Sequence, residues 1–403
     1  MIKLLQINAT YGLGSTGIIA KELSDICIDA GIETYIAYSK GYGQNDISNA
    51  YEIGSWLDHK VHAVCSRIAG KQGYYSKRST INLIKYISSV SPDIVHLHNL
   101  HSNYIHLNTL LEYLSAKNIP TVITMHDCWF FTGGCFHYTS VCCEKWKFSC
   151  GNCIKRHEDT PALLYDASPH ILKDRVRLFS SFKNLTFIGV SNWIVDEFRK
   201  SRLRTFAKVE CIYNGFDLNV FKPSESNLRD KLGLNGKFVI LGPATKWLRP
   251  INKPTLEYFS RNIDTDTVLL LFGHNREDIK LPDNVIFYGF TKSRSEMVEL
   301  YSMADVMVNC SREDTLSSLN IEAQACGTPV VTYDATGSKE TVNDVCGFAV
   351  ETGNYDLLFK MTENVRRLGK KEFSKDCRNF VENHFEKQSN YVKYIDVYKK
   401  ILE

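Results

Sequence analysis

Two carboxylates, Asp314 and Glu322, stand eight residues apart around a predicted loop-to-helix junction. The apolar run 306–308 precedes the polar loop 311–318, and after the helical segment a second apolar run follows at 329–332. Backbone amides at the start of a helix favour an anion. A phosphate that carries a hydroxyl-rich group therefore suits this arrangement. A plain strand–loop–helix–strand unit with serine capping is the alternative interpretation.

The elements that must position these residues alternate along the chain. Buried strands are predicted at 2–8, 33–38, 93–98, 121–125, 185–190, 237–242, 267–272, 285–288, 306–309 and 329–332. Helical patterns lie between most of them, for example at 78–90, 104–117, 192–201, 255–263 and 294–303. Such alternation predicts an α/β fold whose parallel sheets are covered by helices on both faces. Ligands of such sheets bind outside the carboxyl ends of the strands.

The length of the chain and one interruption predict two domains. At 403 residues the chain is too long for one ordinary core. The segment 212–223, which contains Asn-Gly and a proline, breaks the alternation, and we place the domain junction there. The first domain then spans 1–212 and the second 213–385. The last stretch, 386–403, has the pattern of an amphipathic helix.

The composition excludes several classes of protein. A hydrophobic fraction of 44% and a charged fraction of 23% are typical of globular proteins in water, and a net charge of +3 gives no argument for a nucleic acid partner. No apolar run approaches the roughly 18 residues of a membrane-spanning helix. The N-terminus begins as a strand without the features of a signal peptide, so we expect a cytoplasmic protein.

A glycine loop follows the first predicted strand. Gly12, Gly14 and Gly17 have the spacing of a dinucleotide-binding loop, but the next strand offers no suitable acidic residue. A strand, a glycine loop and a helix still let a phosphate or a sugar approach backbone amides. Simple turn chemistry is the alternative.

Motifs spread along the whole chain resemble the retaining GT-B nucleotide-sugar glycosyltransferases called glycosyltransferase family 4. They are Gly12–Gly17, Asp93–Asn99, Thr124–Asp127, Val190–Trp193, Ile212–Asp217 and Asp314–Val331. The chain is most similar to the branch that builds capsule, exopolysaccharide and O-antigen repeat units, which carries a Cys-rich insert. The resemblance implies two doubly wound, Rossmann-like domains that face each other across a cleft. The first, with the insert at 128–153, would bind the acceptor, the second would bind the nucleotide sugar, and the C-terminal helix would return to the first.

The resemblance assigns donor contacts to both carboxylates. Family members carry two Glu residues separated by seven, the first on the sugar and the second on the ribose. Asp314, with its shorter side chain, matches the first position and Glu322 the second. The amides that follow the first carboxylate also contact the donor in the family. Here they belong to Leu316, Ser317 and Ser318, and Gly14 of the first loop is a further donor-binding candidate.

The donor diphosphate needs positive charge, which the family supplies after the first strand of the second domain. Arg249 can bind phosphate oxygens bidentately and Lys253 acts as a point charge, with Lys246 as a further candidate. Exposed basic side chains on a loop are the alternative. His126 follows the strand 121–125 and matches the family histidine that lies beside the reacting carbon. A mere bond to Asp127 or to a backbone carbonyl is the alternative for His126.

Four other histidines, at 96, 98, 101 and 106, suit structural or acceptor-lining roles better than metal binding, because no acidic partner has matching spacing. The resemblance implies a hexosyltransferase that retains the anomeric configuration. Its donor would be a UDP- or GDP-sugar, and its acceptor a glycan, favoured as lipid-linked, in bacterial surface polysaccharide synthesis. The leaving diphosphate oxygen would take the acceptor proton. The chain shows no Asp-x-Asp motif in the expected loops, so no catalytic metal is expected.

Six of the thirteen cysteines lie within 128–153. Cys150 and Cys153 have the spacing of a zinc knuckle, and Cys135 with Cys143 could complete four ligands. Four thiolates would leave no open position, so the predicted zinc ion is structural. Buried thiols and disulfides are the alternatives.

A basic, aromatic stretch on the first domain favours peripheral contact with an anionic membrane. It contains Arg67, Lys71, Tyr74, Tyr75, Lys77, Arg78 and Lys85. An ordinary solvated helix face is the alternative. Two other functions compete with the leading hypothesis: a catalytically inactive GT-B protein that binds sugars or partners, and a synthase that uses a free small acceptor.

Overall fold

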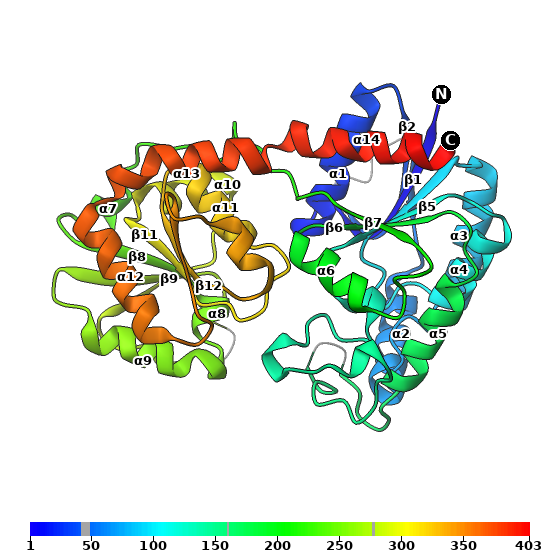
Figure 1. Ribbon diagram of the computed structural model, residues 1–403, viewed down its shortest axis with the longest axis horizontal. Helices are drawn as coiled ribbons and strands as arrows, with labels where there is room; N and C mark the ends of the chain where they lie inside the picture. The colour runs from blue at the N-terminus through cyan, green and yellow to red at the C-terminus, as the bar shows by residue number, and fades with distance from the viewer. Residues whose placement is uncertain (42–48, 159–160, 276–278) are drawn as a thin grey trace. The chain divides into compact units, whose positions relative to one another are not determined.

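The computed structural model describes residues 1–41, 49–158, 161–275 and 279–403 (Figure 1). The chain divides into two compact units. The first contains Met1–Asn214 together with Gln388–Glu403, and the second contains Gly215–Lys387. Each unit is built on one parallel sheet with helices packed against it, so the predicted α/β architecture with two parallel-sheet domains is confirmed.

The sheet of the first unit has seven strands in the order β3-β2-β1-β4-β5-β6-β7. Their bounds are β1 Lys3–Tyr11, β2 Glu33–Gly41, β3 Ala50–Glu52, β4 Ile94–Leu97, β5 Thr121–Met125, β6 Leu185–Gly189 and β7 Lys208–Cys211. The helices are α1 Gly14–Asp29, α2 Trp56–Ala69, α3 Lys77–Val90, α4 Leu107–Ala116, α5 Ser168–Phe179, α6 Asn192–Lys200 and α14 Lys387–Leu402. Three short 3-10 helices lie in the Cys-rich insert: η1 Trp129–Phe131, η2 Thr139–Val141 and η3 Lys145–Lys147.

The sheet of the second unit has six strands in the order β10-β9-β8-β11-β12-β13. Their bounds are β8 Phe238–Pro243, β9 Thr267–Phe272, β10 Val285–Gly289, β11 Val306–Asn309, β12 Val330–Tyr333 and β13 Gly347–Val350. The helices are α7 Leu228–Lys231, α8 Ala244–Trp247, α9 Lys253–Asn262, α10 Arg294–Met303, α11 Ser318–Ala325, α12 Tyr355–Leu368 and α13 Lys370–Phe385. The 3-10 helices are η4 Pro250–Asn252 and η5 Thr336–Thr341.

Both sheets reverse their strand order once, and this reversal positions the loops. The reversal falls between β1 and β4 in the first unit and between β8 and β11 in the second. At such a switch point the loops after the two central strands separate and leave room for a ligand. The loops that follow β8 and β11 are those that carry Lys246 and Asp314.

The sequence patterns did not predict three short edge strands, β3, β7 and β13. The strands β3, β7 and β13 each lie at the edge of a sheet and have only three or four residues. Edge strands are partly exposed, so they lack the continuous apolar run that marks a central parallel strand. The central strands β4, β5 and β11 are buried throughout and were predicted.

The C-terminal helix α14 belongs to the first unit because it supplies part of that unit's core (Figure 1). Its buried tyrosines at 391, 394 and 398 pack in one cluster with Leu4, Leu23 and Val122. The hydroxyl of Tyr398 also lies 2.7 Å from Nδ1 of the buried His96. Among the helices of the described segments, none is long and apolar enough to cross a bilayer.

Candidate functional site

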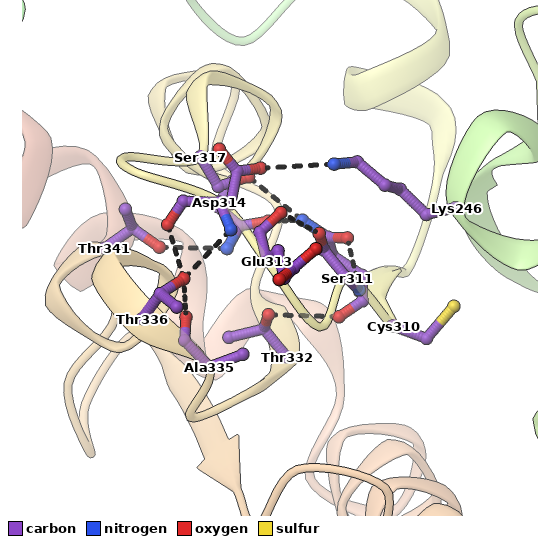
Figure 2. Close-up of polar contacts among 12 residues, drawn as sticks. Lys246, Cys310, Ser311, Glu313, Asp314, Ser317, Thr332, Ala335, Thr336 and Thr341 are labelled. Carbon is purple, nitrogen blue, oxygen red and sulfur yellow. Dashed lines mark hydrogen bonds and ion pairs between the residues drawn. The ribbon is translucent and has the colours of Figure 1, made fainter. Parts of the chain in front are cut away.

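Lys246 and Asp314 meet at the switch point of the second sheet. Lys246 lies on α8, directly after β8, and Asp314 lies on the loop after β11. The ammonium nitrogen of Lys246 is 3.6 Å from Oδ2 of Asp314, and about a quarter or less of each side chain is exposed (Figure 2). The pair therefore brings a cation and an anion together at the edge of the sheet where ligands bind.

Thr336 holds the backbone of Asp314 in place (Figure 2). The amide of Asp314 donates to Oγ1 of Thr336 over 2.9 Å, and Oγ1 of Thr336 lies 2.5 Å from the carbonyl oxygen of Asp314. The amide of Gly337 donates to the same carbonyl over 3.0 Å. Thr336 has a φ of 55°, which costs energy for a β-branched residue. The loop after β12 thus clamps the loop that carries the carboxylate.

A buried polar network stiffens the rest of this loop. The side-chain amide of Asn309 donates to Oγ of Ser317 and to Oδ1 of Asn320, both over 2.9 Å. Ser311 donates through its hydroxyl to the carbonyl of Glu313 over 3.0 Å. These bonds join the end of β11 to the start of α11. The candidate binding groups on this loop are therefore held in place by the protein's own hydrogen bonds.

The amides at the start of α11 lack partners within the described residues, although Leu316 and Ser317 are buried. Within the part of the chain that the structure describes, the N–H groups of Leu316, Ser317 and Ser318 make no hydrogen bond. Their N–H groups stand at the positive end of the helix dipole. The helix ends at Ala325, and Gly327, two residues later, has a φ of 76°, the left-handed conformation that commonly follows a helix.

Glu322 projects from α11 into a buried environment. The hydroxyl of Tyr301, a fully buried residue of α10, donates to Oε2 of Glu322 over 2.9 Å. Burial raises the pKa of Glu322 to about 7, although the Tyr301 hydrogen bond acts in the opposite direction. A carboxylate of this kind changes its charge near neutral pH.

The predicted cations Arg249 and Lys253 make no ion pair with the acid in the described part of the chain. Arg249 is exposed just before η4. Lys253 begins α9, has a side chain that is 74% exposed, and approaches Glu257 at 3.9 Å. No ion pair joins either residue to Asp314 among the described residues. Lys246 is thus the basic residue that contacts the candidate acid.

Sequence reasoning missed Thr336 altogether. Its only signal was a short run of small residues, Ala335 to Ser338, which begins three positions after the predicted strand 329–332. Such a run predicts a turn, but it does not show which loop the turn will grip.

In the first unit, His126 follows β5. Its ring contacts His98, and no hydrogen bond joins it to the adjacent Asp127 in the described residues. Nε2 of His126 lies 3.3 Å from Nδ1 of His98. The carboxylate of Asp127 instead contacts Nε2 of His101 at 3.0 Å and accepts from the amide of Trp129 over 2.8 Å. Burial lowers the pKa of His126 to about 4, so its imidazole is neutral at pH 7.

Asp127 stays ionised in this buried setting. Burial by itself raises the pKa of its carboxyl group, but the His101 contact and the Trp129 amide together hold that pKa below the usual value. Gly14 begins α1 with a φ of 63°, and a Cβ there would meet nothing within 4 Å. Backbone conformation rather than space is therefore what favours glycine at this position.

The four predicted zinc ligands do not form a metal site in the described part of the chain. No group of three or more His, Cys, Asp or Glu side chains in those residues is placed to hold a metal ion. Cys143, Cys150 and Cys153 carry thiols, and burial raises the pKa of Cys150 to about 11. Cys135, the fourth predicted ligand, is half-buried on the same insert. The zinc prediction is therefore unsupported by the placement of these side chains.

Comparison with known proteins identifies both halves of the chain. Residues 18–220, about half of the chain, match the model of Glycosyltransferase Family 4, and residues 256–387 match the model of glycosyl transferases group 1. A putative glycosyltransferase of Bacillus subtilis, YtcC, is 30% identical over 203 residues, which cover 39% of this chain and 49% of that protein. An uncharacterized 41.2 kDa protein in the cps region of Klebsiella pneumoniae is 21% identical over 383 residues, which cover 88% and 94%.

Solved structures extend the likeness over the whole chain. Sucrose-phosphate synthase from Thermosynechococcus elongatus has a TM-score of 0.71 at 15% identity and covers 100% of this chain and 99% of that one. Anabaena HepE in complex with UDP-glucose has a TM-score of 0.67 at 15% identity and covers 99% and 100%. These likenesses show the GT-B fold. The chain spans about half the length, or less, of the first curated relatives that it matches. By its family match the chain belongs to glycosyltransferase family 4.

Proposed function

We propose that this protein transfers a hexose from a UDP- or GDP-sugar to a glycan acceptor with retention of the anomeric configuration. The observation that carries the proposal lies at the switch point of the second sheet. Asp314 and Lys246 form an ion pair there, and the amides of residues 316–318 on the same loop have no hydrogen-bond partner among the described residues. A diphosphate joined to a sugar presents both anionic oxygens and hydroxyl donors, and this cluster offers a partner to each. The structural neighbour HepE binds UDP-glucose, which supports a nucleotide-sugar donor.

Each group has a proposed role. Asp314 accepts hydrogen bonds from sugar hydroxyls, and Glu322 accepts them from the ribose. Lys246 and the amides of Leu316 to Ser318 stabilise the charge that grows on the leaving diphosphate. Arg249 and Lys253 remain candidates for the same task, since both are exposed and able to turn toward a ligand.

The reaction keeps its atoms and charges in balance without a protein base. The bond between the anomeric carbon and the diphosphate oxygen breaks, and the acceptor oxygen bonds to the same face of that carbon. The departing diphosphate oxygen takes the proton of the acceptor hydroxyl. The zinc prediction has no support in the placement of the cysteines, and zinc forms no part of this proposal.

A lipid-linked glycan is the proposed acceptor, which would place the protein at the cytoplasmic face of a membrane in surface polysaccharide synthesis. The relative in the Klebsiella cps region agrees with that setting. Three exposed basic residues on α3, Lys77, Arg78 and Lys85, support contact with anionic lipid. The helix α2 adds an exposed apolar row made of Trp56, Leu57, Val61, Val64 and Ile68.

The exposed row on α2 has the character of a helix that lies in a membrane surface. The amide of Leu163 donates to the carbonyl of Arg67 over 2.7 Å, so the exposed segment 163–165 continues the row. Lys60 lies beside the row with its ammonium group 5.4 Å from the centroid of the Trp56 ring. Apolar side chains flanked by cations favour an anionic bilayer over water.

Vesicle flotation tests the membrane proposal. The protein should float with anionic vesicles and not with vesicles of neutral lipid. Val64→Asp should abolish flotation, because it places a carboxylate within the apolar row. Val345→Asp in the second unit is the matched control, since both valines are 55% exposed. Retention of wild-type flotation by Val64→Asp would rule out α2 as the contact.

A screen of nucleotide sugars for the release of UDP or GDP tests the transfer itself. Asp314→Ala and Glu322→Ala should each abolish release, whereas Glu372→Ala, which removes an exposed carboxylate on α13, should leave it unchanged. Full activity in both site variants would overturn the assignment of the site. The competing function is an inactive GT-B protein. Calorimetry decides between them, because failure to bind either UDP or GDP would favour the inactive protein.

A further inference from the structure

Three polar side chains form a line through the core of the first unit. Gln6 lies on β1, His98 follows β4, and His126 follows β5, so all three belong to neighbouring strands of one sheet. Gln6 and His98 are fully buried, whereas His126 is half-buried and lies at the end of the line. The roles predicted from the family motifs do not involve Gln6. They also do not account for the contact between His98 and His126.

The orientation of the Gln6 amide is determined by its surroundings. Its Nε2 donates to the carbonyl oxygen of Ala20 over 3.1 Å and to Oγ of Ser24 over 2.7 Å. A flipped amide would set two carbonyl oxygens against each other, because a backbone carbonyl can only accept. Oε1 of Gln6 therefore faces His98, whose Nε2 lies 2.8 Å away. That nitrogen must carry a hydrogen.

The same logic passes from His98 to His126. Burial holds the pKa of His98 well below its usual range, so the imidazole is neutral and carries one hydrogen. With that hydrogen on Nε2, its Nδ1 is a lone pair. Nε2 of His126, 3.3 Å away, must then donate, since two facing lone pairs would repel. The remaining nitrogen of the neutral His126 ring, Nδ1, has a lone pair and no hydrogen.

We propose that His98, oriented by Gln6, is a positioning residue that holds His126 as the Nε2–H tautomer, so that Nδ1 of His126 accepts a hydrogen bond from a substrate hydroxyl. An acceptor at this place favours a hydroxyl and repels a phosphate oxygen, which is itself an acceptor. The half-buried ring of His126 therefore selects the sugar part of a ligand and not its phosphate. That the hydroxyl belongs to a sugar rests on the proposed transferase function.

His96 provides a matched control for this relay. It is also fully buried, and its ring centroid lies 4.1 Å from that of His98. Its nitrogens contact the hydroxyl of Tyr398 at 2.7 Å and Oγ1 of Thr124 at 2.8 Å, and neither contacts His126. Replacement of His96 therefore disturbs the core about as much as replacement of His98 without breaking the line.

Nitrogen NMR of the full-length protein with 15N-labelled histidine tests the inference directly. At pH 7.5 the wild type should show His126 with a protonated Nε2 and an unprotonated Nδ1. His98→Phe and Gln6→Met should each give a mixture of His126 tautomers, and His96→Phe should not. The His126 signals are assigned by their loss in His126→Gln. A wild-type His126 that carries its hydrogen on Nδ1 would overturn the inference, as would an unchanged tautomer in both His98→Phe and Gln6→Met.

Turnover separates this inference from the proposed function. With an active donor and acceptor pair, His98→Phe should lower kcat/KM by tenfold or more, and His96→Phe should lower it less than threefold. A wild-type kcat/KM in His98→Phe would overturn the positioning role even where the tautomer shifts. The absence of any transfer by the wild type would count against the proposed function alone, because the NMR result does not depend on turnover.

Discussion

The ammonium group of Lys246 lies 3.6 Å from the carboxylate of Asp314, although 68 positions of the chain separate the two residues. The pair exists because β8 and β11 are adjacent in the sheet, so the loops that follow them begin side by side. The contact singles out Lys246 from the three basic residues of this region as the one already held against the candidate acid. It also orients Asp314, whose backbone Thr336 secures independently.

Replacement of Lys246 should impair transfer far more than replacement of Lys253. Lys246→Met removes a cation that faces the proposed diphosphate, so we expect kcat/KM to fall by about 100-fold, the usual effect of removing one preorganised charge-stabilising group. Lys253→Met should reduce kcat/KM less than about threefold, because the Lys253 ammonium group lies by Glu257 of its own helix and, unlike that of Lys246, is not held against Asp314. Steady-state kinetics check both variants. Equal losses in the two would contradict the priority given to Lys246.

The Thr336 clamp should be visible in both stability and activity. Thr336→Val keeps the shape of the side chain but leaves the amide of Asp314 without its acceptor. We expect a loss of about 1–3 kcal/mol of unfolding free energy, measured by urea titration. Thr336→Ser retains the hydroxyl and should preserve both stability and turnover. A Val variant as stable and active as the wild type would show that the clamp is unimportant.

Nucleotide binding should strengthen as pH rises through 7. Burial raises the pKa of Glu322 to about 7, so the carboxylate that would accept from ribose hydroxyls is fully formed only above that pH. Tyr301→Phe removes a hydrogen bond that stabilises the ionised form, so it should move the midpoint to higher pH. Calorimetry with UDP and GDP between pH 6 and 8.5 measures both effects, and Glu322→Gln, which cannot ionise, corrects for titration of the nucleotide itself. A midpoint that moves to lower pH in Tyr301→Phe would contradict the assignment.

The stability of the Cys-rich insert should depend on the buried Arg175. The guanidinium of Arg175, on α5, lies 4.1 Å from the centroid of the Trp129 ring and donates to the backbone carbonyls of Trp129 and Thr132. Arg175→Met should lower the free energy of unfolding by about 2–3 kcal/mol in a urea titration, because it leaves the carbonyl groups of Trp129 and Thr132 without this donor. Arg177→Met, two residues along the same helix, removes an exposed pair with Glu112 and a longer contact of 3.9 Å with Asp174, and it should lower the free energy of unfolding by less than about 1 kcal/mol. An equally small loss of unfolding free energy in Arg175→Met and Arg177→Met would show that the buried contacts of Arg175 contribute little to stability.

Stability should decline in mild acid because of buried neutral histidines. Burial lowers the pKa of His96 to about 3 in the folded protein, whereas an unfolded chain has the ordinary value of 6.5. The unfolded state therefore binds this proton first as pH falls below 6.5, and stability is lost progressively from there toward pH 3. Urea unfolding at pH 7.5, 6 and 4.5 measures the slope. His96→Phe should make the slope shallower, and an equal or steeper slope would contradict this cause.

Much of the fold could be predicted from the sequence because parallel sheets leave a local record. Central strands such as Ile94–Leu97 and Val306–Asn309 are buried on both faces, so an unbroken apolar run marks each one. The candidate site also leaves a local record in the sequence. Asp314, Glu322 and the serines between them stand out because a loop, a helix start and an acid pair are all local features.

The tertiary structure decided what those residues touch. Lys246 meets Asp314, Thr336 grips the same loop, and His98 meets His126 through contacts that join separate strands and loops. Their partners depend on strand order and register, which no local pattern encodes. The sequence alone therefore determined which acids are candidates and that they lie on a loop and the helix that follows it. Which cation faces the acid, and which nitrogen of His126 is left to accept a hydrogen bond, follow only from how the strands assemble.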